Sequence, residues 1–263
     1  MKWRPASRLA TPPLFLAAAF LSLWGCPAVA DGRATLWDIV HDQCLVAARN
    51  DTNPAPCSYV ETYMGTAKGY AVLKDIVGDA QFLLIPTKRL SGIESPDLVA
   101  PDAPNYWQAA WEARRYLNLK LERTLPRNAI GMAVNSSAKR SQDQLHIHID
   151  CVRPEVVRAL AEHADDIGEQ WRTTPFRLIG RYFIARRVSS PDLEDVNPFR
   201  LLYSSSADAA ADMGHETLIV VGATFSNHRE GFVLLSEKAT TIKGSGHGED
   251  LLDHTCAVRN GAR

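Results

Sequence analysis

An eight-residue stretch near the middle of the chain, Gln144–Cys151, alternates strictly between polar and apolar side chains. Successive side chains of a β-strand point to opposite faces, so this alternation predicts a strand with one face in the core. The polar face carries Gln144, His146, His148 and Asp150, where a solvated strand usually carries Lys, Thr, Glu or Ser. The core face carries Leu145, Ile147, Ile149 and Cys151. The chain must therefore contain a well-packed sheet, and this strand marks a candidate site on it.

Other segments predict further strands and helices around this strand. Apolar residues at helical spacing predict helices over Thr35–Arg49, over Tyr106–Leu121 and from Pro154 to Trp171. Short apolar runs separated by polar turns predict two hairpins. The predicted strands are Tyr70–Lys74, Gln81–Ile85, Ala129–Val134, Leu145–Cys151, Arg181–Val188, Thr217–Ala223 and Gly231–Ser236, and residues 50–58, 86–104 and 136–143 are predicted loops. Strand pairs with interspersed helices indicate an α+β fold built on an antiparallel sheet.

The first 30 residues have the features of an export segment. Lys2, Arg4 and Arg8 precede an apolar run over Leu14–Trp24, and the small-residue pattern of a signal-peptidase site ends at Ala30. The run is shorter than the roughly 20 residues that a membrane-spanning helix needs. We therefore expect export, with residues 1–30 acting either as a cleaved signal peptide or as an N-terminal membrane anchor. Lipidation of Cys26 is a third possible fate.

Four cysteines remain if the export segment is removed together with Cys26. An even number of cysteines in an exported chain is typical of disulfides, and four of them allow three pairings. We expect Cys44 to pair with Cys57 across a short loop, and Cys151 to pair with Cys256, joining the C-terminus to the middle of the chain. No pair has the C-x2-C spacing of a structural zinc site.

The charge balance gives no indication of a nucleic-acid partner. The chain has 29 Lys and Arg residues against 30 Asp and Glu, and removal of the three basic residues in the export segment leaves 26 against 30, a net charge of −4. A protein that binds nucleic acid through a broad basic surface would show the opposite balance.

The polar face of the central strand permits metal chemistry. His146 and His148 could bind a metal ion, with Asp150 as a third ligand or as an orienting group. The H-x-H-x-D pattern resembles the start of the metallo-β-lactamase motif, which continues into a histidine where this chain has Cys151. Further ligands would have to come from His163, His215, His228, His247 or His254. Two surface histidines without a chemical role are the remaining structural alternative.

The same face also permits nucleophilic catalysis at phosphorus. A neutral imidazole is a good nucleophile near pH 7, and His146 could pass a phosphoryl-type group on to water. Such a histidine needs an acceptor on its far nitrogen and hydrogen-bond donors around the phosphate oxygens. Polar residues upstream that could supply these donors are Asn135, Ser141, Gln142 and Gln144.

The central strand resembles the histidine-triad (HIT) motif, His-φ-His-φ-His, with Gln144 in place of the first histidine. Phe82–Arg89 is similar to the strand of that superfamily that ends in an Ile-Pro-Lys turn. Within the superfamily, the chain is most similar to the bacterial CDP-diacylglycerol pyrophosphatases. The resemblance covers some 200 residues and includes the cysteine positions, Gly69–Asp75, Glu94–Pro96, Trp107–Arg114, His146–Pro154, Ala185–Val188, Gly231–Leu235 and Asp253–Cys256.

The resemblance implies a single HIT-like catalytic domain over residues 31–263, an antiparallel sheet with packed helices, that hydrolyses CDP-diacylglycerol to CMP and phosphatidate. In this interpretation His146 attacks the cytidylyl phosphorus, while His148 and Gln144 orient it. The groups implied to bind phosphate or ribose are Asn135, Ser141, Gln142 and Gln144, with Lys88 near the diphosphate. Neither a metal nor another cofactor is required.

The expected partners are CDP-diacylglycerol, CMP and a membrane lipid surface, at the periplasmic face of the bacterial inner membrane. Two other functions remain open. One is a less lipid-specific nucleotide pyrophosphatase or nucleotidyl transferase of the same fold. The other is an exported nucleotide-binding protein without turnover.

Overall fold

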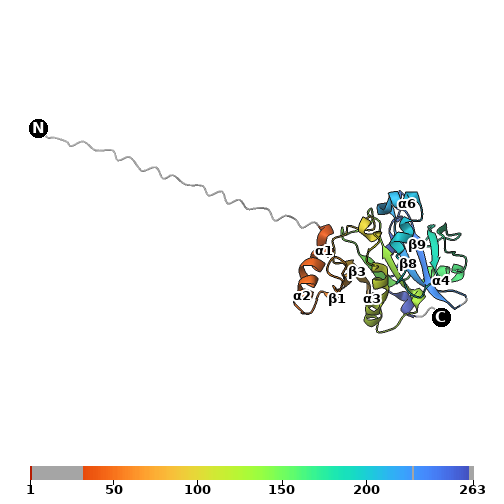
Figure 1. Cartoon of the computed structure of the whole chain (residues 1–263), viewed down its shortest axis with the longest axis horizontal. Helices are drawn as coiled ribbons and strands as arrows, with labels where there is room; N and C mark the ends of the chain where they lie inside the picture. Colours follow the sequence, from red (N-terminus) through yellow and green to blue (C-terminus); the bar gives the residue numbers. More distant parts are fainter. Residues whose placement is uncertain (2–31, 227, 261–263) are drawn as a thin grey trace. The chain divides into compact units, whose positions relative to one another are not determined.

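The structure, a computed structural model, describes residues 1, 32–226 and 228–260 (Figure 1). The predictions about the export segment and Cys26 fall outside these residues. Among the described helices, none combines the length and the apolar character that a membrane span requires.

The core of the fold is one sheet of nine strands in the order β1-β2-β3-β5-β4-β8-β9-β7-β6. Every neighbouring pair is antiparallel. The central strand of the sequence pattern is β5, which lies between β3 and β4. The strands are β1 Cys57–Glu61, β2 Tyr70–Lys74, β3 Phe82–Pro86, β4 Ile130–Val134, β5 Ile147–Cys151, β6 Arg172–Thr173, β7 Ile184–Val188, β8 Leu218–Thr224 and β9 Glu230–Ser236. With the helices packed against the sheet, the predicted α+β fold class is confirmed.

The helices are mostly short. The predicted N-terminal helix is present as α1, a π-helical stretch η2 and α2. The α-helices are α1 Thr35–Asp38, α2 Leu45–Arg49, α3 Tyr106–Lys120, α4 Pro154–His163, α5 Pro198–Tyr203 and α6 Ala207–Ala211. The shorter helical segments are η1 Gly32–Ala34, η2 Ile39–Cys44, η3 Pro96–Leu98, η4 Arg127–Ala129, η5 Met213–His215, η6 Gly248–Leu251 and η7 Ala257–Asn260.

Several element boundaries differ from the sequence prediction, most of them by one to three residues. The predicted loop over residues 50–58 is wrong at its end, because Cys57 already pairs with Leu73 in the antiparallel ladder of β1 and β2. The helix that begins at Pro154 ends at His163 rather than at Trp171. Its apolar pattern continues because Ile167, beyond the helix end, is still buried against the same core cluster. The strands β1 and β6 and the helices α5 and α6 were not predicted.

Apolar side chains pack on both faces of the sheet. On one face, α3 covers β3, β4 and β5, and the buried residues there include Trp107, Leu117 and Ile147. On the other face, the N-terminal helical segment covers β2 and β3, while α4 packs over β8 and β9. Figure 1 shows α1 and α4 at opposite ends of the folded part. The second face therefore has two separate apolar clusters, and β5 lies between them.

Two disulfides cross-link the chain, in the predicted pairing. Cys44 in η2 is bonded to Cys57 at the start of β1, with their Cα atoms 5.8 Å apart. Cys151 at the end of β5 is bonded to Cys256 near the C-terminus, with a Cα–Cα distance of 5.1 Å. Disulfides are typical of proteins that fold in an oxidising compartment.

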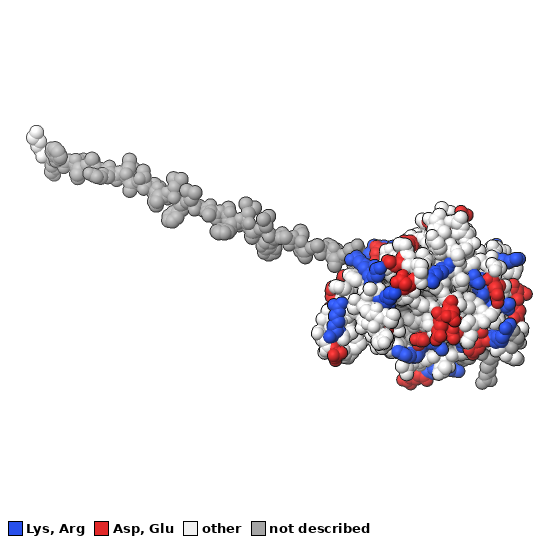
Figure 2. All heavy atoms as spheres, viewed as in Figure 1, with Lys and Arg blue, Asp and Glu red and all other residues white. Residues whose placement is uncertain are grey.

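Charged side chains of both signs are interspersed over the face shown in Figure 2. The ion pairs of the described residues include Arg140 with Glu94 and Arg127 with Glu230. The expectation that nucleic acid is not a partner stays a prediction.

Candidate active site

The two histidines of the central strand project to the same face of the sheet, as the alternation predicts. His146 lies just before β5 and His148 within it, and each is only 6% exposed. Their rings meet edge to face, with centroids 4.8 Å apart and planes at 71°. The alternate residues, which include Ile147 and Ile149, are buried in the core on the α3 side. The strand therefore fixes both imidazoles from behind.

The neighbouring strands explain why the histidines lie in a recess. His148 pairs with Leu83 of β3 on one side and with Ala133 of β4 on the other. Paired residues of adjacent strands point to the same face. Leu83 belongs to the cluster under the N-terminal helical segment, and Ala133 belongs to the cluster under α4. The histidines consequently lie at the boundary between the two clusters.

A cavity of about 300 Å³ opens in front of the histidines. Its apolar wall is formed by Leu36, Ile39, Leu73, Ile76, Val77 and Leu83. Its polar wall is formed by Thr35, Lys74, Asp75, Ser141, Gln142, His146, His148 and Glu249. A largely apolar recess with a few convergent polar groups is the usual form of a small-molecule site.

The backbone orients the ring of His146. Its Nδ1 lies 2.7 Å from the carbonyl oxygen of Gln144, so Nδ1–H donates to that oxygen and the lone pair is on Nε2. Nε2 forms no hydrogen bond with a described residue, and the ring lines the cavity. Burial lowers the pKa of His146 below its ordinary value, which outweighs the opposing effect of the Gln144 carbonyl. His146 is therefore a neutral imidazole near pH 7, with its free nitrogen available to a ligand.

His148 contacts both an amide and a carboxylate through one nitrogen. Its Nδ1 lies 3.2 Å from Nε2 of Gln81 and 3.3 Å from Oε1 of Glu249. Its Nε2 is buried and has no hydrogen-bond partner among the described residues. Burial lowers the pKa of His148 to about 4, and the nearby Glu249 carboxylate only partly offsets this effect. An unpaired buried nitrogen is costly, so Nε2 marks a place where a ligand atom would be bound.

Glu249 comes from η6, about 100 residues beyond β5 in the chain. Its Oε2 accepts a hydrogen bond of 3.1 Å from Nδ2 of Asn135, and its own backbone N–H donates to Oδ1 of the same asparagine at 3.1 Å. Burial raises the pKa of Glu249, but His148, Asn135 and Gln81 together lower it below its ordinary value. Glu249 is therefore an ionised carboxylate beside His148.

Asp150 does not join His146 and His148 as a third ligand. Its Oδ2 lies 2.9 Å from Nδ1 of His254, and its Oδ1 accepts a hydrogen bond from the backbone N–H of Cys151. Among the described residues, the only group of three potential metal ligands with atoms within 4.8 Å of one another is Asp150, Cys151 and Cys256. Those two sulfur atoms form a disulfide and are not thiolates, so the donor set does not suit a metal. His146, His148 and Asp150, on which the metal interpretation depends, therefore do not form one group of ligands.

The other predicted binding residues lie in different places. Ser141 and Gln142 line the cavity, and the Gln142 side chain also holds the N-terminal segment through Gly32 O and Leu36 N. Asn135 reaches the site through Glu249 rather than by lining the cavity.

Gln144 and Lys88 are not among the residues that line the cavity. The buried Gln144 amide donates to the carbonyls of Pro86 and Lys88 and accepts from the N–H of Leu90. Its side chain therefore fixes the loop after β3, while its backbone carbonyl orients His146. Lys88 forms an exposed ion pair with Asp97, at 2.9 Å.

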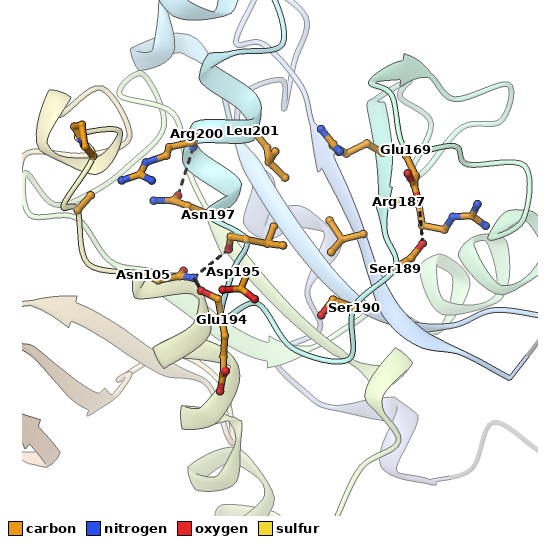
Figure 3. A pocket seen from close by; sticks show the side chains of 15 residues that line it. Asn105, Glu169, Arg187, Ser189, Ser190, Glu194, Asp195, Asn197, Arg200 and Leu201 are labelled. Atoms are coloured by element: carbon orange, nitrogen blue, oxygen red, sulfur yellow. Dashed lines mark hydrogen bonds between the residues drawn. The ribbon is translucent and has the colours of Figure 1, made fainter.

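A larger hollow, of about 580 Å³, lies elsewhere and shares no lining residue with the histidine cavity. Figure 3 shows Arg187 and Arg200 around it, together with Glu169, Glu194 and Asp195. Its size exceeds that of the histidine cavity. It has no histidine among its lining residues, however, whereas the histidine cavity holds a His146 ring that is oriented by a backbone carbonyl.

Four contributors to the site were not predicted from the sequence: Asp75, Gln81, Glu249 and His254. Asp75 and Gln81 flank the turn between β2 and β3 and were assigned no role in the site. His254 was considered as a possible metal ligand. The Gly69–Asp75 and Asp253–Cys256 segments belong to the family resemblance, and this was the signal that could have pointed to Asp75 and His254.

Comparison with known proteins places the chain in a family. Residues 31–260 match the family model of the CDP-diacylglycerol pyrophosphatases. A relative from Yersinia pestis, named CDP-diacylglycerol pyrophosphatase, is 39% identical over 224 residues, which cover 85% of this chain and 84% of that protein. The range matched by the family model contains the whole sheet, both disulfides and every residue that lines the cavity. The chain therefore belongs to the CDP-diacylglycerol pyrophosphatase family.

Proposed function

We propose that this chain hydrolyses CDP-diacylglycerol to CMP and phosphatidate, with His146 as the nucleophile. The observation that carries this proposal is the orientation of His146, whose Nδ1 is held by the Gln144 carbonyl while its ring faces the cavity. Family membership supports the substrate, since the name of the family specifies CDP-diacylglycerol and its diphosphate bond.

In the proposed reaction, Nε2 of His146 attacks the cytidylyl phosphorus. A nitrogen–phosphorus bond forms, and the bond from this phosphorus to the bridging oxygen breaks, so that phosphatidate leaves with the electron pair. A phosphate monoester is a good leaving group and needs little help from a general acid. Water then attacks the same phosphorus, the bond to His146 breaks, and CMP is released. The buried Nε2 of His148 is placed to donate to a phosphate oxygen.

The shape of the cavity suits the nucleoside part of the substrate. Apolar side chains such as Leu36 and Leu73 provide surfaces for the faces of a cytosine ring, and Asp75 provides a carboxylate that can accept from ribose hydroxyls. Because the cytidylyl group is the one transferred to His146, its nucleoside has to lie next to that histidine. Ser141, Gln142 and Asn135 are proposed to bind phosphate or ribose, directly or through neighbouring groups. Lys88 would reach the diphosphate only by leaving Asp97.

We further propose that the enzyme acts at the periplasmic face of the inner membrane. The two disulfides support an oxidising compartment, and the two acyl chains of the substrate require a lipid surface. The fate of residues 1–30, as a cleaved signal peptide or an anchor, is part of this proposal.

The test is turnover of CDP-diacylglycerol, labelled in the cytidylyl phosphate, in excess EDTA. Release of labelled CMP, together with an acid-labile label on the protein, is the expected result. Activity that EDTA abolishes and zinc restores would instead favour the metal interpretation. Equal turnover of soluble CDP-alcohols would indicate a less lipid-specific hydrolase, and binding without turnover would indicate a nucleotide-binding protein.

The pH dependence of kcat/KM follows from the state of His146. The nucleophile must be neutral, so activity falls as the pH decreases through the pKa of this histidine. Because burial lowers that pKa, the midpoint of the acidic limb is expected below pH 6.5, the ordinary value for histidine. Circular dichroism over the same pH range separates this effect from unfolding. A midpoint above pH 6.5 in the folded enzyme would contradict the prediction.

Substitution of Asp75 tests the proposed ribose contact. Asp75→Asn keeps the size of the side chain but removes its charge, and we expect KM to increase by about tenfold with a smaller change in kcat. A substrate without the 2′- and 3′-hydroxyl groups provides the control. The parent enzyme should bind it more weakly than CDP-diacylglycerol, whereas the variant should hardly distinguish the two. Equal discrimination by both enzymes would rule out the contact.

A further inference from the structure

Three side chains behind the histidines form a continuous chain of charged groups that the proposed reaction does not yet use. Nε2 of His254 lies 3.4 Å from Oε1 of Glu249, and the same oxygen lies 3.3 Å from Nδ1 of His148. On the far side, Nδ1 of His254 lies 2.9 Å from Oδ2 of Asp150, a fully buried carboxylate. The order of the groups is therefore Asp150, His254, Glu249 and His148.

The chemistry of His254 follows from its two neighbours. Each of its ring nitrogens faces a carboxylate oxygen, and both nitrogens can donate only when the ring is an imidazolium. The hydrogen bond with Asp150 raises the pKa of His254, in agreement with this state. A positive ring between two carboxylates holds Glu249 in position without removing its negative charge.

The covalent structure holds this arrangement together. Asp150 directly precedes Cys151, His254 lies two residues before Cys256, and these two cysteines are joined. The disulfide therefore fixes the C-terminal segment against the end of β5. Backbone hydrogen bonds add to it, since Asp253 N–H donates to the Cys151 carbonyl at 2.8 Å.

We propose that Glu249, held by His254 and Asp150, is a positioning residue for His148. It orients the His148 ring by accepting a hydrogen bond from Nδ1–H. Together with the bound diphosphate, its negative charge stabilises the imidazolium form of His148, in which Nε2–H can donate to a phosphate oxygen. The inference rests on the proposed function, because it requires that Nε2 of His148 donates to a phosphate oxygen of the substrate. The other charged or titratable groups that act on His148 are His146, Asp75 and His247, and none of them contacts Nδ1 in place of Glu249.

The decisive variant is Glu249→Gln, which keeps the size of the side chain and one acceptor oxygen but removes its charge. We expect kcat to fall by about 10- to 100-fold with KM within about threefold of the parent. If Glu249 acted only by filling the space beside His148, glutamine would replace it and kcat would not change. Glu155→Gln, on the exposed surface of α4, is the matched control and should leave both parameters unchanged.

A double-mutant cycle distinguishes action through His148 from any other effect. In a His148→Gln background, Glu249→Gln should cause less than about a twofold further loss of kcat. His254 is only half-buried, which allows a second variant, His254→Gln. It should lower kcat about 3- to 10-fold and likewise lose its effect in that background. The second variant decides the question if Glu249→Gln does not fold, as judged by thermal melting.

Two results would overturn the inference. One is a kcat of the folded Glu249→Gln variant within twofold of the parent, and the other is a full loss that persists in the His148→Gln background. Failure of the proposed function would look different, since the His146→Ala variant would then retain turnover. An inactive His146→Ala variant together with an unaffected Glu249→Gln variant would reject only the positioning role.

Discussion

His146→Ala is expected to reduce kcat for CDP-diacylglycerol by at least about 10³-fold and to abolish the acid-labile label on the protein. The size of the loss follows from the role of a nucleophile, whose removal eliminates the covalent route altogether. His148→Ala should be less severe, at about 10²-fold, because it removes one donor to the phosphate and leaves the nucleophile. The measurement is a radiochemical assay of CMP release with acid precipitation of the protein.

A matched control separates chemistry from stability. His163→Ala removes a half-exposed imidazole at the end of α4, which is paired with Asp166 and shares no contact with the histidine cavity, and it should retain full activity. Thermal melting of the His146→Ala and His148→Ala variants shows whether the protein still folds after either change in the buried site. Label that remains on the folded His146→Ala variant would place the nucleophile elsewhere, and His148 would be the next residue to test.

The part of the site that could be predicted is the part that depends on local spacing. The period of a β-strand places His146 and His148 on one face and Ile147 on the other, whatever the rest of the chain does. The same local logic gave the hairpin of β2 and β3 and the helix α3. The alternation alone could not decide between metal binding and nucleophilic catalysis. The family resemblance favoured nucleophilic catalysis.

The remaining residues could not be predicted, because their positions depend on tertiary contacts. Glu249 and His254 lie about 100 residues after β5, and a disulfide and a short helical turn bring them to the histidines. Gln144 shows the opposite case. It stands at a motif position, yet its side chain forms hydrogen bonds with the loop after β3. Only its backbone carbonyl oxygen accepts a hydrogen bond from His146. Nothing in the spacing of single residues distinguishes these two situations.

Loss of the Cys151–Cys256 disulfide is expected to have the largest effect on stability. The bond spans 105 residues, whereas Cys44–Cys57 spans 13. In the chain-entropy description, loops of these sizes correspond to about 4.7 and 3 kcal/mol of stabilisation of the folded state. Replacement of both cysteines by alanine should therefore lower the free energy of unfolding by about 3–5 kcal/mol for the long loop and by less for the short one. Urea denaturation of the two double variants and the parent measures this difference, and equal losses would contradict the prediction.

The two disulfides should also affect catalysis in different ways. The Cys44–Cys57 bond holds the N-terminal helical segment, which supplies Leu36 to the cavity wall, so its loss should increase KM more than it lowers kcat. The Cys151–Cys256 bond holds His254 against Asp150, so its loss should lower kcat in the manner of Glu249→Gln. Both variants are to be assayed well below their melting temperatures, where each is folded. The opposite pattern, with KM sensitive to the long loop and kcat to the short one, would mean that the C-terminal segment serves binding of the substrate rather than the orientation of His148.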